Sequence, residues 1–201
     1  MKTEDIFLKK GIVKGKSTKA LTVFDSVVND FTTLSYLTPS DYINTVWNDY
    51  LDYVPHNKDL NGKIFEYLLI SLLINEGLTP IYIQAKAAFV PNVDFDLLLY
   101  TKEKPIVLSA KTSLRERYKQ ADLEAIALKY VHRKAESFLL TLNETESKSV
   151  NEKIKAGGVI GINEVILASS SEMNNFISYL KKLQFEEAGS VEIITASSII
   201  R

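Results

Sequence analysis

The stretch from residue 93 to residue 120 constrains the fold most, because it predicts a strand, a short polar turn, a second strand and the start of a helix. The turn at residues 101–104 is short enough for an antiparallel hairpin. Side chains alternate between the two faces of a strand, so Ser109 and Lys111 share one face of the second strand. The other face is apolar and carries Ile106, Leu108 and Ala110. Such a hairpin would bring Asp96, on the first strand, beside Lys111.

Helices and strands are predicted in alternating order around this hairpin. Residues 1–58 are helical apart from a stretch near 35–40, and an apolar helix over 62–76 ends at Gly77, where a left-handed residue would stop it. A strand lies within residues 78–88. The elements predicted after the hairpin are a helix capped by Thr112 or Ser113, a strand over 137–142, an exposed helix or mobile loop over 143–155, a strand over 164–168, a helix over 172–183 and a strand over 191–196.

This order of elements predicts a single α/β domain over residues 1–201. Its centre is expected to be a mixed β-sheet of about five strands flanked by helices, with a helical N-terminal portion at residues 1–58 packed against it.

The composition limits the kinds of site that the chain can hold. With 201 residues, 46% of them hydrophobic, the chain suits one globular domain. It has no cysteine and two histidines, so disulfides and thiolate sites are excluded and a histidine-based zinc centre is not expected. Any metal would therefore have oxygen ligands. The absence of a signal region and of a spanning apolar run predicts a cytoplasmic protein with no membrane partner.

Charge is distributed unevenly along the chain. The net charge of −1 gives no overall attraction to nucleic acid. Residues 111–134, however, carry seven basic side chains against three acidic ones, a local excess of four positive charges. The basic residues are Lys111, Arg115, Arg117, Lys119, Lys129, Arg133 and Lys134. Positive charge is thus concentrated next to the hairpin.

Two upstream helices carry residues with competing interpretations. In the helix that follows Thr38, the aromatic and aliphatic residues recur at helical spacing, which favours core packing over stacking on bases. These residues are Tyr42, Ile43, Val46, Trp47, Tyr50 and Leu51. In the helix over 62–76, an ionised Glu66 would cost several kcal/mol unless it is paired or binds a cation. Lys63, one turn earlier, is the structural partner, and a metal-associated role is the alternative.

The residues of the hairpin and its neighbours resemble the PD-(D/E)XK nuclease superfamily, and in particular type II restriction endonucleases. The signature of that superfamily is an Asp on one strand and an acid-x-Lys on the next. The resemblance covers about residues 60–142, which it implies to be the catalytic core. It is carried by Glu66, Val93-Asp94-Phe95-Asp96, Ser109-Ala110-Lys111 and the run 112–120. Val93 stands where Pro is usual, and Ser109 stands where Asp or Glu is usual.

The resemblance implies an endonuclease that depends on Mg²⁺, for which Mn²⁺ can substitute, and that cuts a short specific site in double-stranded DNA. Asp96 is the first choice as metal ligand and Asp94 the second. Lys111 would orient the attacking water and neutralise charge that develops on the phosphate. Arg115, Arg117 and Lys119 would contact phosphates, or they form a solvated charged face.

The acid missing at Ser109 must be replaced if the metal needs two carboxylates. Ser-x-Lys variants of the superfamily take such an acid from a helix. Glu124, thirteen residues after Lys111, has a spacing similar to theirs, and Glu66 is the competing donor; both could contribute.

Partners and alternatives also follow from the resemblance. A palindromic site implies a homodimer, and a restriction system implies a cognate DNA methyltransferase. A nuclease that acts on DNA ends or junctions would share every motif residue. The serine at position 109 favours a third alternative, a catalytically degraded module that binds DNA.

Overall fold

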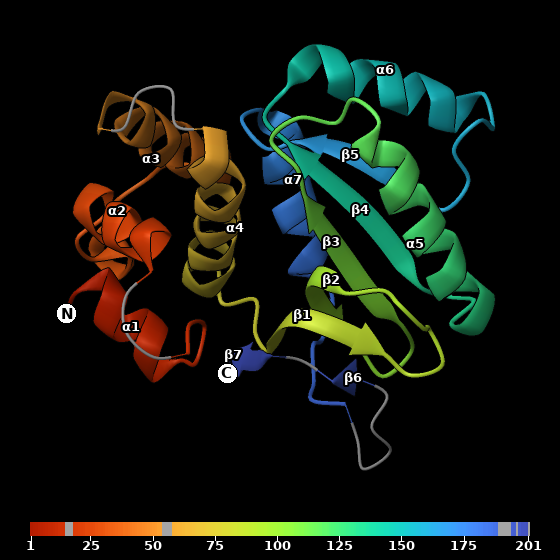
Figure 1. The fold of residues 1–201 in the computed structure, drawn as a ribbon, viewed down its shortest axis with the longest axis horizontal. Coiled ribbons are helices and arrows are strands. Elements are labelled where there is room, and N and C mark those ends of the chain that lie inside the picture. The colour runs from red at the N-terminus through yellow and green to blue at the C-terminus, as the bar shows by residue number, and fades with distance from the viewer. Residues whose placement is uncertain (15–17, 54–57, 189–193, 196, 201) are drawn as a thin grey trace.

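A mixed β-sheet forms the centre of the computed structural model, which describes residues 1–14, 18–53, 58–188, 194–195 and 197–200. The strand order is β5-β4-β3-β2-β1-β6, and β7 also pairs with β1 (Figure 1). The main strands are β1 (Ile81–Ala87), β2 (Phe95–Tyr100), β3 (Pro105–Ala110), β4 (Glu136–Thr141) and β5 (Glu164–Leu167). Strands β1 to β3 are antiparallel neighbours, whereas β4 and β5 join β3 in parallel. The predicted α/β fold with a central mixed sheet and an N-terminal helical part is confirmed.

The hairpin of β2 and β3 forms as predicted. Thr101 and Lys104 close the turn by exchanging two backbone hydrogen bonds, of 3.0 and 3.2 Å. The antiparallel register pairs Leu97 with Leu108 and Leu98 with Val107. Continued by one step, this register places Asp96 directly opposite Ser109. Residues directly opposite each other lie on the same face, so the hydroxyl and the carboxylate belong to one face of the sheet.

The N-terminal helical part comprises α1 (Thr3–Lys9), α2 (Lys19–Val27), a 3₁₀ turn (Phe31–Thr33), α3 (Pro39–Tyr53) and α4 (Lys58–Asn75). In α3 the predicted apolar face is buried at Tyr42, Ile43, Val46 and Tyr50. Trp47 is partly buried and Leu51 is exposed. The helix therefore packs into the core through most of its aromatic stripe, and the end of the stripe stays at the surface.

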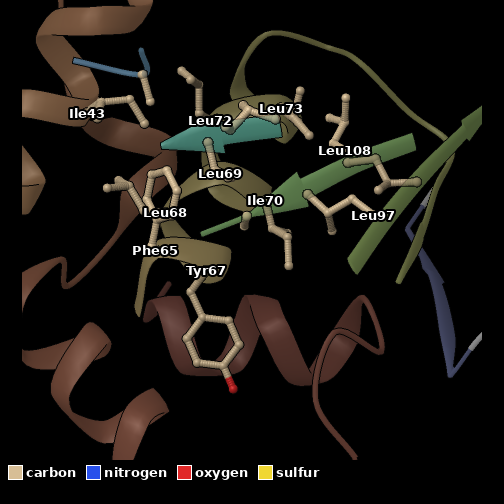
Figure 2. Close-up of a cluster of buried hydrophobic side chains, with 14 of the residues drawn as sticks. Ile43, Phe65, Tyr67, Leu68, Leu69, Ile70, Leu72, Leu73, Leu97 and Leu108 are labelled. Carbon is tan, nitrogen blue, oxygen red and sulfur yellow. The ribbon is translucent and has the colours of Figure 1, made fainter. Parts of the chain in front are cut away.

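Helix α4 joins the helical part to the sheet. Its residues 67–73 are all buried, and Figure 2 shows Leu69 and Ile70 of α4 in one cluster with Leu97 and Leu108 of the hairpin. Gly77 follows with φ +72° and ends the helix as predicted, because its N–H donates to Ile74 O and the next N–H donates to Leu73 O. Helix α7 (Ser171–Leu180) packs into the same core through Phe176 and Leu180.

The opposite face of the sheet is covered by α5 (Arg117–Val131) and α6 (Glu144–Lys155), as Ala125 and Val150 show by packing with Leu139. The predicted cap at Thr112 or Ser113 is wrong, because α5 begins at Arg117. Residues 112–116 form a loop instead. Glu146 of α6 holds this loop outside the helix by accepting hydrogen bonds from Ser113 and Leu114. Of the two alternatives for residues 143–155, the helix is the one observed.

The C-terminal strands lie beside β1. Strand β6 is Ile194–Thr195 and β7 is Ser198–Ile200; β7 was not predicted. The strand predicted over 191–196 falls partly on residues outside those described. Among the described residues, no helix is long and apolar enough to cross a membrane.

Candidate active site

Asp96 and Lys111 form the centre of the candidate site. Asp96 is the second residue of β2, and Lys111 directly follows β3. The Lys111 ammonium donates to Asp96 Oδ2 at 2.8 Å, and the Ala110 N–H donates to the same oxygen at 3.0 Å. The Lys111 N–H donates to Leu140 O at 3.0 Å, which fixes the lysine backbone against β4. The predicted pairing of an amine with a carboxylate across the hairpin is therefore present in the structure.

Both charged groups are partly withdrawn from water. The Asp96 side chain is 13% exposed and that of Lys111 is 25% exposed. Among the described residues, no hydrogen bond reaches the second oxygen of Asp96, Oδ1. That oxygen is the one that can accept a further ligand without displacing the lysine.

The backbone of β1 is irregular beside Asp96. Gln84 has φ +48° and lies between two regular pairs, Ile83 with Leu97 and Ala85 with Phe95. The same register places Gln84 opposite Asp96. A positive φ is uncommon for a residue with a side chain, and such backbone conformations are enriched at functional sites.

Asp94 does not join the pair. It precedes β2, its side chain is 54% exposed, and it lies 3.6 Å from Lys86 of β1. Its carboxylate is directed to a surface ion pair and away from Lys111.

Glu66 lies in α4 and pairs with Lys63, the partner that the sequence spacing of one helical turn suggested. Lys63 donates to Glu66 Oε2 at 2.7 Å, and the lysine ammonium also lies 5.2 Å from the Tyr67 ring centroid. The glutamate side chain is 18% exposed. The ion pair therefore satisfies the carboxylate without a metal.

Glu124 is engaged within its own helix. It accepts a hydrogen bond from Gln120 at 2.7 Å, while the buried face of α5 is formed by Ala121, Ala125 and Leu128. Ser109 is buried and adds no negative charge.

The acidic residues therefore do not converge. Within the part of the chain that the structure describes, no three acidic or histidine side chains form a group that could hold a metal. A Mg²⁺ ion can nevertheless be bound through one carboxylate together with water and substrate phosphate oxygens. Asp96, with its uncommitted Oδ1, fits that smaller ligand set.

Glu146 supports the site and was missed by sequence reasoning. Its carboxylate accepts from the Leu114 N–H at 2.6 Å and from Ser113 Oγ at 3.3 Å. This contact holds the loop that follows Lys111. The available signal was local: Asn143 caps α6 by accepting from the Glu146 N–H, which places that glutamate in the first helical turn.

A cleft of about 1090 Å³ is lined by Thr112 and Ser113, the two residues that follow Lys111, while Asp96 and Lys111 are not among its lining residues. It lies at the carboxyl ends of the parallel strands β3 and β4, between the helical part and the loop after β3. Trp47, Asn61, Arg115, Arg117 and Asn143 contribute to its walls. Lys119 is not among the lining residues and forms an ion pair with Glu116. Two of the three predicted phosphate contacts thus face the cleft.

Comparisons with protein-family models, curated proteins and solved structures found no match to this chain.

Proposed function

We propose that this protein is a Mg²⁺-dependent endonuclease of the PD-(D/E)XK type that hydrolyses phosphodiester bonds of double-stranded DNA, acting as a type II restriction enzyme. The observation that carries the proposal is the 2.8 Å contact of Lys111 with Asp96, because the loop that follows Lys111 lines a cleft together with two arginines. In open α/β sheets, ligands bind outside the carboxyl ends of the strands, which is where this cleft lies.

Lys111 has the position and charge for the chemical step. Its ammonium, held by Asp96, would lie where negative charge develops on the attacked phosphate, and it would orient the attacking water. Asp96 would keep the ammonium in place through Oδ2 and present Oδ1 to the metal. A bound Mg²⁺ would supply charge neutralisation at the phosphoryl oxygens and a more acidic water.

A second carboxylate would have to leave its present partner. Glu66 would exchange Lys63 for the metal, and Glu124 would exchange Gln120. Both acids are candidates for the ligand that Ser109 does not supply.

Binding of DNA would involve the basic residues after the hairpin. Arg115 and Arg117 line the cleft and make no ion pair with any described residue, so both are available to phosphates. Lys119 would first have to release Glu116. A homodimer on a palindromic site, a cytoplasmic location and a cognate methyltransferase complete the proposal.

Digestion of a plasmid of known sequence tests the function. We expect cleavage with Mg²⁺ or Mn²⁺ and none with EDTA, because the ligand set consists of oxygens. Discrete bands would support restriction, whereas smearing or dependence on DNA ends would support the end-processing nuclease. Full activity in EDTA contradicts the metal-dependent mechanism.

A catalytically degraded DNA-binding module is the second candidate. It is favoured by the serine at position 109 and by the lack of a third converging acid among the described residues. DNA binding without cleavage under any divalent cation would select it.

A further inference from the structure

The cleft beside Lys111 has walls from two distant parts of the chain. One wall is formed by α3 and α4 of the helical part, and the other by the loop after β3 and the start of α6. In Figure 1, α3 and the upper end of α4 face the segment that joins β3 to α5. The volume of about 1090 Å³ reaches the upper end of the range for small-molecule sites, about 300–1,000 Å³, and therefore suits a segment of a polymer.

Trp47 gives the helical wall an aromatic surface. Its ring packs against Tyr50 and Phe65, with centroid distances of 5.2 and 6.0 Å, so those neighbours support it from within the core. The indole is partly buried and contributes to the cleft wall. A well-supported aromatic ring in the wall of a cleft is the kind of surface on which a nucleic-acid base stacks.

A polar residue that can hydrogen-bond to a base lies on the same wall of the cleft as this ring. Asn61 lines the same wall, and its Oδ1 accepts from the Tyr50 hydroxyl at 2.7 Å. The bond through Oδ1 fixes the orientation of the amide, so its amino group is the side that remains able to donate. A base carries carbonyl and ring-nitrogen acceptors that such a donor can reach.

The opposite wall carries positive charge. Arg115 and Arg117 line it without an ion-pair partner among the described residues, and the one acidic lining residue, Glu144, is paired with Lys148 at 2.6 Å. The amino-terminal end of β4 and β5 differs, because a hollow there is lined by Glu136, which is paired with Lys104, and by Glu164 and Glu172. A polyanion would therefore be attracted to the cleft and repelled from the other end of the sheet.

We propose that the cleft binds an unpaired segment of DNA, with one base stacked on Trp47 and the adjoining phosphates held by Arg115 and Arg117. The combination of an aromatic platform with a positively charged groove is the arrangement that binds single strands without reading their sequence. Helix α3, whose aromatic stripe the sequence predicted to pack in the core, becomes part of one wall of the DNA-binding cleft. The proposal extends the nuclease function but does not depend on cleavage.

Fluorescence tests this arrangement directly, because Trp47 is the only tryptophan of the chain. The intact protein in EDTA is titrated with a single-stranded oligothymidylate, and in parallel with inorganic polyphosphate. We expect the oligonucleotide to quench the tryptophan emission and polyphosphate to leave it nearly unchanged. Equal quenching by polyphosphate, or unchanged emission once the oligonucleotide is bound, overturns the stacking.

Substitutions test the contributions of the two walls of the cleft separately. Stacking contributes about 1–3 kcal/mol per base, so Trp47→Leu should weaken binding of a labelled oligonucleotide at least about fivefold in anisotropy titrations. Trp47→Phe keeps an aromatic ring against Tyr50 and Phe65 and should weaken binding less. Tyr53→Leu is the matched control, since Tyr53 is an exposed aromatic residue of the same helix outside the cleft lining. A loss with Tyr53→Leu equal to that with Trp47→Leu contradicts the assignment.

The arginine wall has its own control. Arg115→Ala and Arg117→Ala should each weaken binding and reduce its salt dependence, because each removes one phosphate contact. Arg133 is exposed, at the far end of α5, and Arg133→Ala should change neither. Equal effects of all three variants would show nonspecific attraction and overturn the site.

The outcome is independent of the nuclease proposal. If the protein never cleaves DNA but its tryptophan is quenched by the oligonucleotide, the cleft assignment holds and the nuclease assignment fails. If the protein cleaves a plasmid and Trp47→Leu cleaves and binds as the parent does, the nuclease assignment holds and the cleft assignment fails.

Discussion

Two lysine–carboxylate ion pairs have nearly equal N···O distances but lie in different surroundings. In α4, Lys63 and Glu66 are three residues apart in sequence and 2.7 Å apart in space. Across the hairpin, Lys111 and Asp96 are fifteen residues apart and separated by 2.8 Å. The helical pair needs only one turn of helix, whereas the hairpin pair needs the register of two strands. The carboxylate of the hairpin pair also accepts a backbone N–H.

The comparison shows that distance alone does not separate a structural ion pair from a candidate site. Neighbours at this spacing on a helix stabilise it by about 0.2–0.5 kcal/mol and need no further role. The hairpin pair instead holds two charges partly out of water, just before the loop that lines the cleft, and it leaves one carboxylate oxygen uncommitted. That combination suits a group that meets a substrate.

The largest expected difference between the pairs is in cleavage rate. Lys111→Ala should lower the cleavage rate at least about 100-fold, because it removes a preorganised charge at the phosphate. Lys63→Ala removes the corresponding amine of the helical pair and should leave the rate within about twofold. Single-turnover digestion with both variants measures this difference. Parental cleavage by Lys111→Ala would remove the hairpin from the mechanism.

Asp96→Asn should separate cleavage from binding. The amide can still accept the Ala110 N–H through its oxygen but no longer balances the lysine charge, so we expect a loss of about 1–2 kcal/mol in the free energy of unfolding. Cleavage should be lost while DNA binding in EDTA is equal or tighter, since a negative charge near the phosphates is removed. Urea unfolding and a gel-shift titration measure the two effects. Cleavage at the parental rate would exclude Asp96 as the ligand.

Gln84→Gly tests whether the irregular backbone of β1 opposite Asp96 is strained. Glycine adopts the φ of +48° without strain, so the free energy of unfolding should stay the same or rise by up to about 1 kcal/mol. Gln84→Val should lower it by more than about 1 kcal/mol, because a β-branched side chain disfavours positive φ. Denaturant unfolding of both variants gives the values. A more stable valine variant would show that the strand can become regular opposite Asp96.

Glu66→Gln has the smallest expected effect if Glu66 is only structural. Its ion pair with Lys63 is partly exposed, so the change in unfolding free energy should be below about 0.5 kcal/mol. Cleavage should then remain within about threefold of the parent, and Glu124→Gln serves as the parallel test for α5. A folded Glu66→Gln or Glu124→Gln protein with a large loss of cleavage would identify the acid that replaces the one absent at Ser109.

Local patterns predicted much of the fold. The turn at Thr101–Lys104 and the glycine after α4 are set by neighbouring residues, and each was found as expected. Strand β3 is buried on both faces, because Val107 packs in a second apolar cluster. The start of α5 was not predictable in the same way. Glu146, more than thirty residues away, holds Ser113 and the Leu114 N–H in a loop, so a tertiary contact overrides the local capping signal.

In the candidate site, too, contacts set by local sequence were predictable and positions set by tertiary packing were not. The hairpin spacing predicted the contact of Asp96 with Lys111 because two adjacent strands were sufficient to form it. The positions of Glu66 and Glu124 depended on how two helices are rotated on opposite faces of the sheet, which periodicity alone does not specify. The place of Trp47 in the cleft wall was not predictable for a related reason: a residue on an apolar stripe can also line a surface cleft when the stripe continues past the core.

The position of β1 has a consequence for the newly made chain. Ile81 of β1 pairs with Ile200, so one edge of β1 has no partner until residues 194–200 have been synthesised. During that interval the strand offers unpaired N–H and C=O groups to any other extended segment, including β1 of another nascent copy. A pause in translation between β5 and β6 would prolong this exposure. Yield of the protein in cells should therefore depend on how quickly that last stretch is completed.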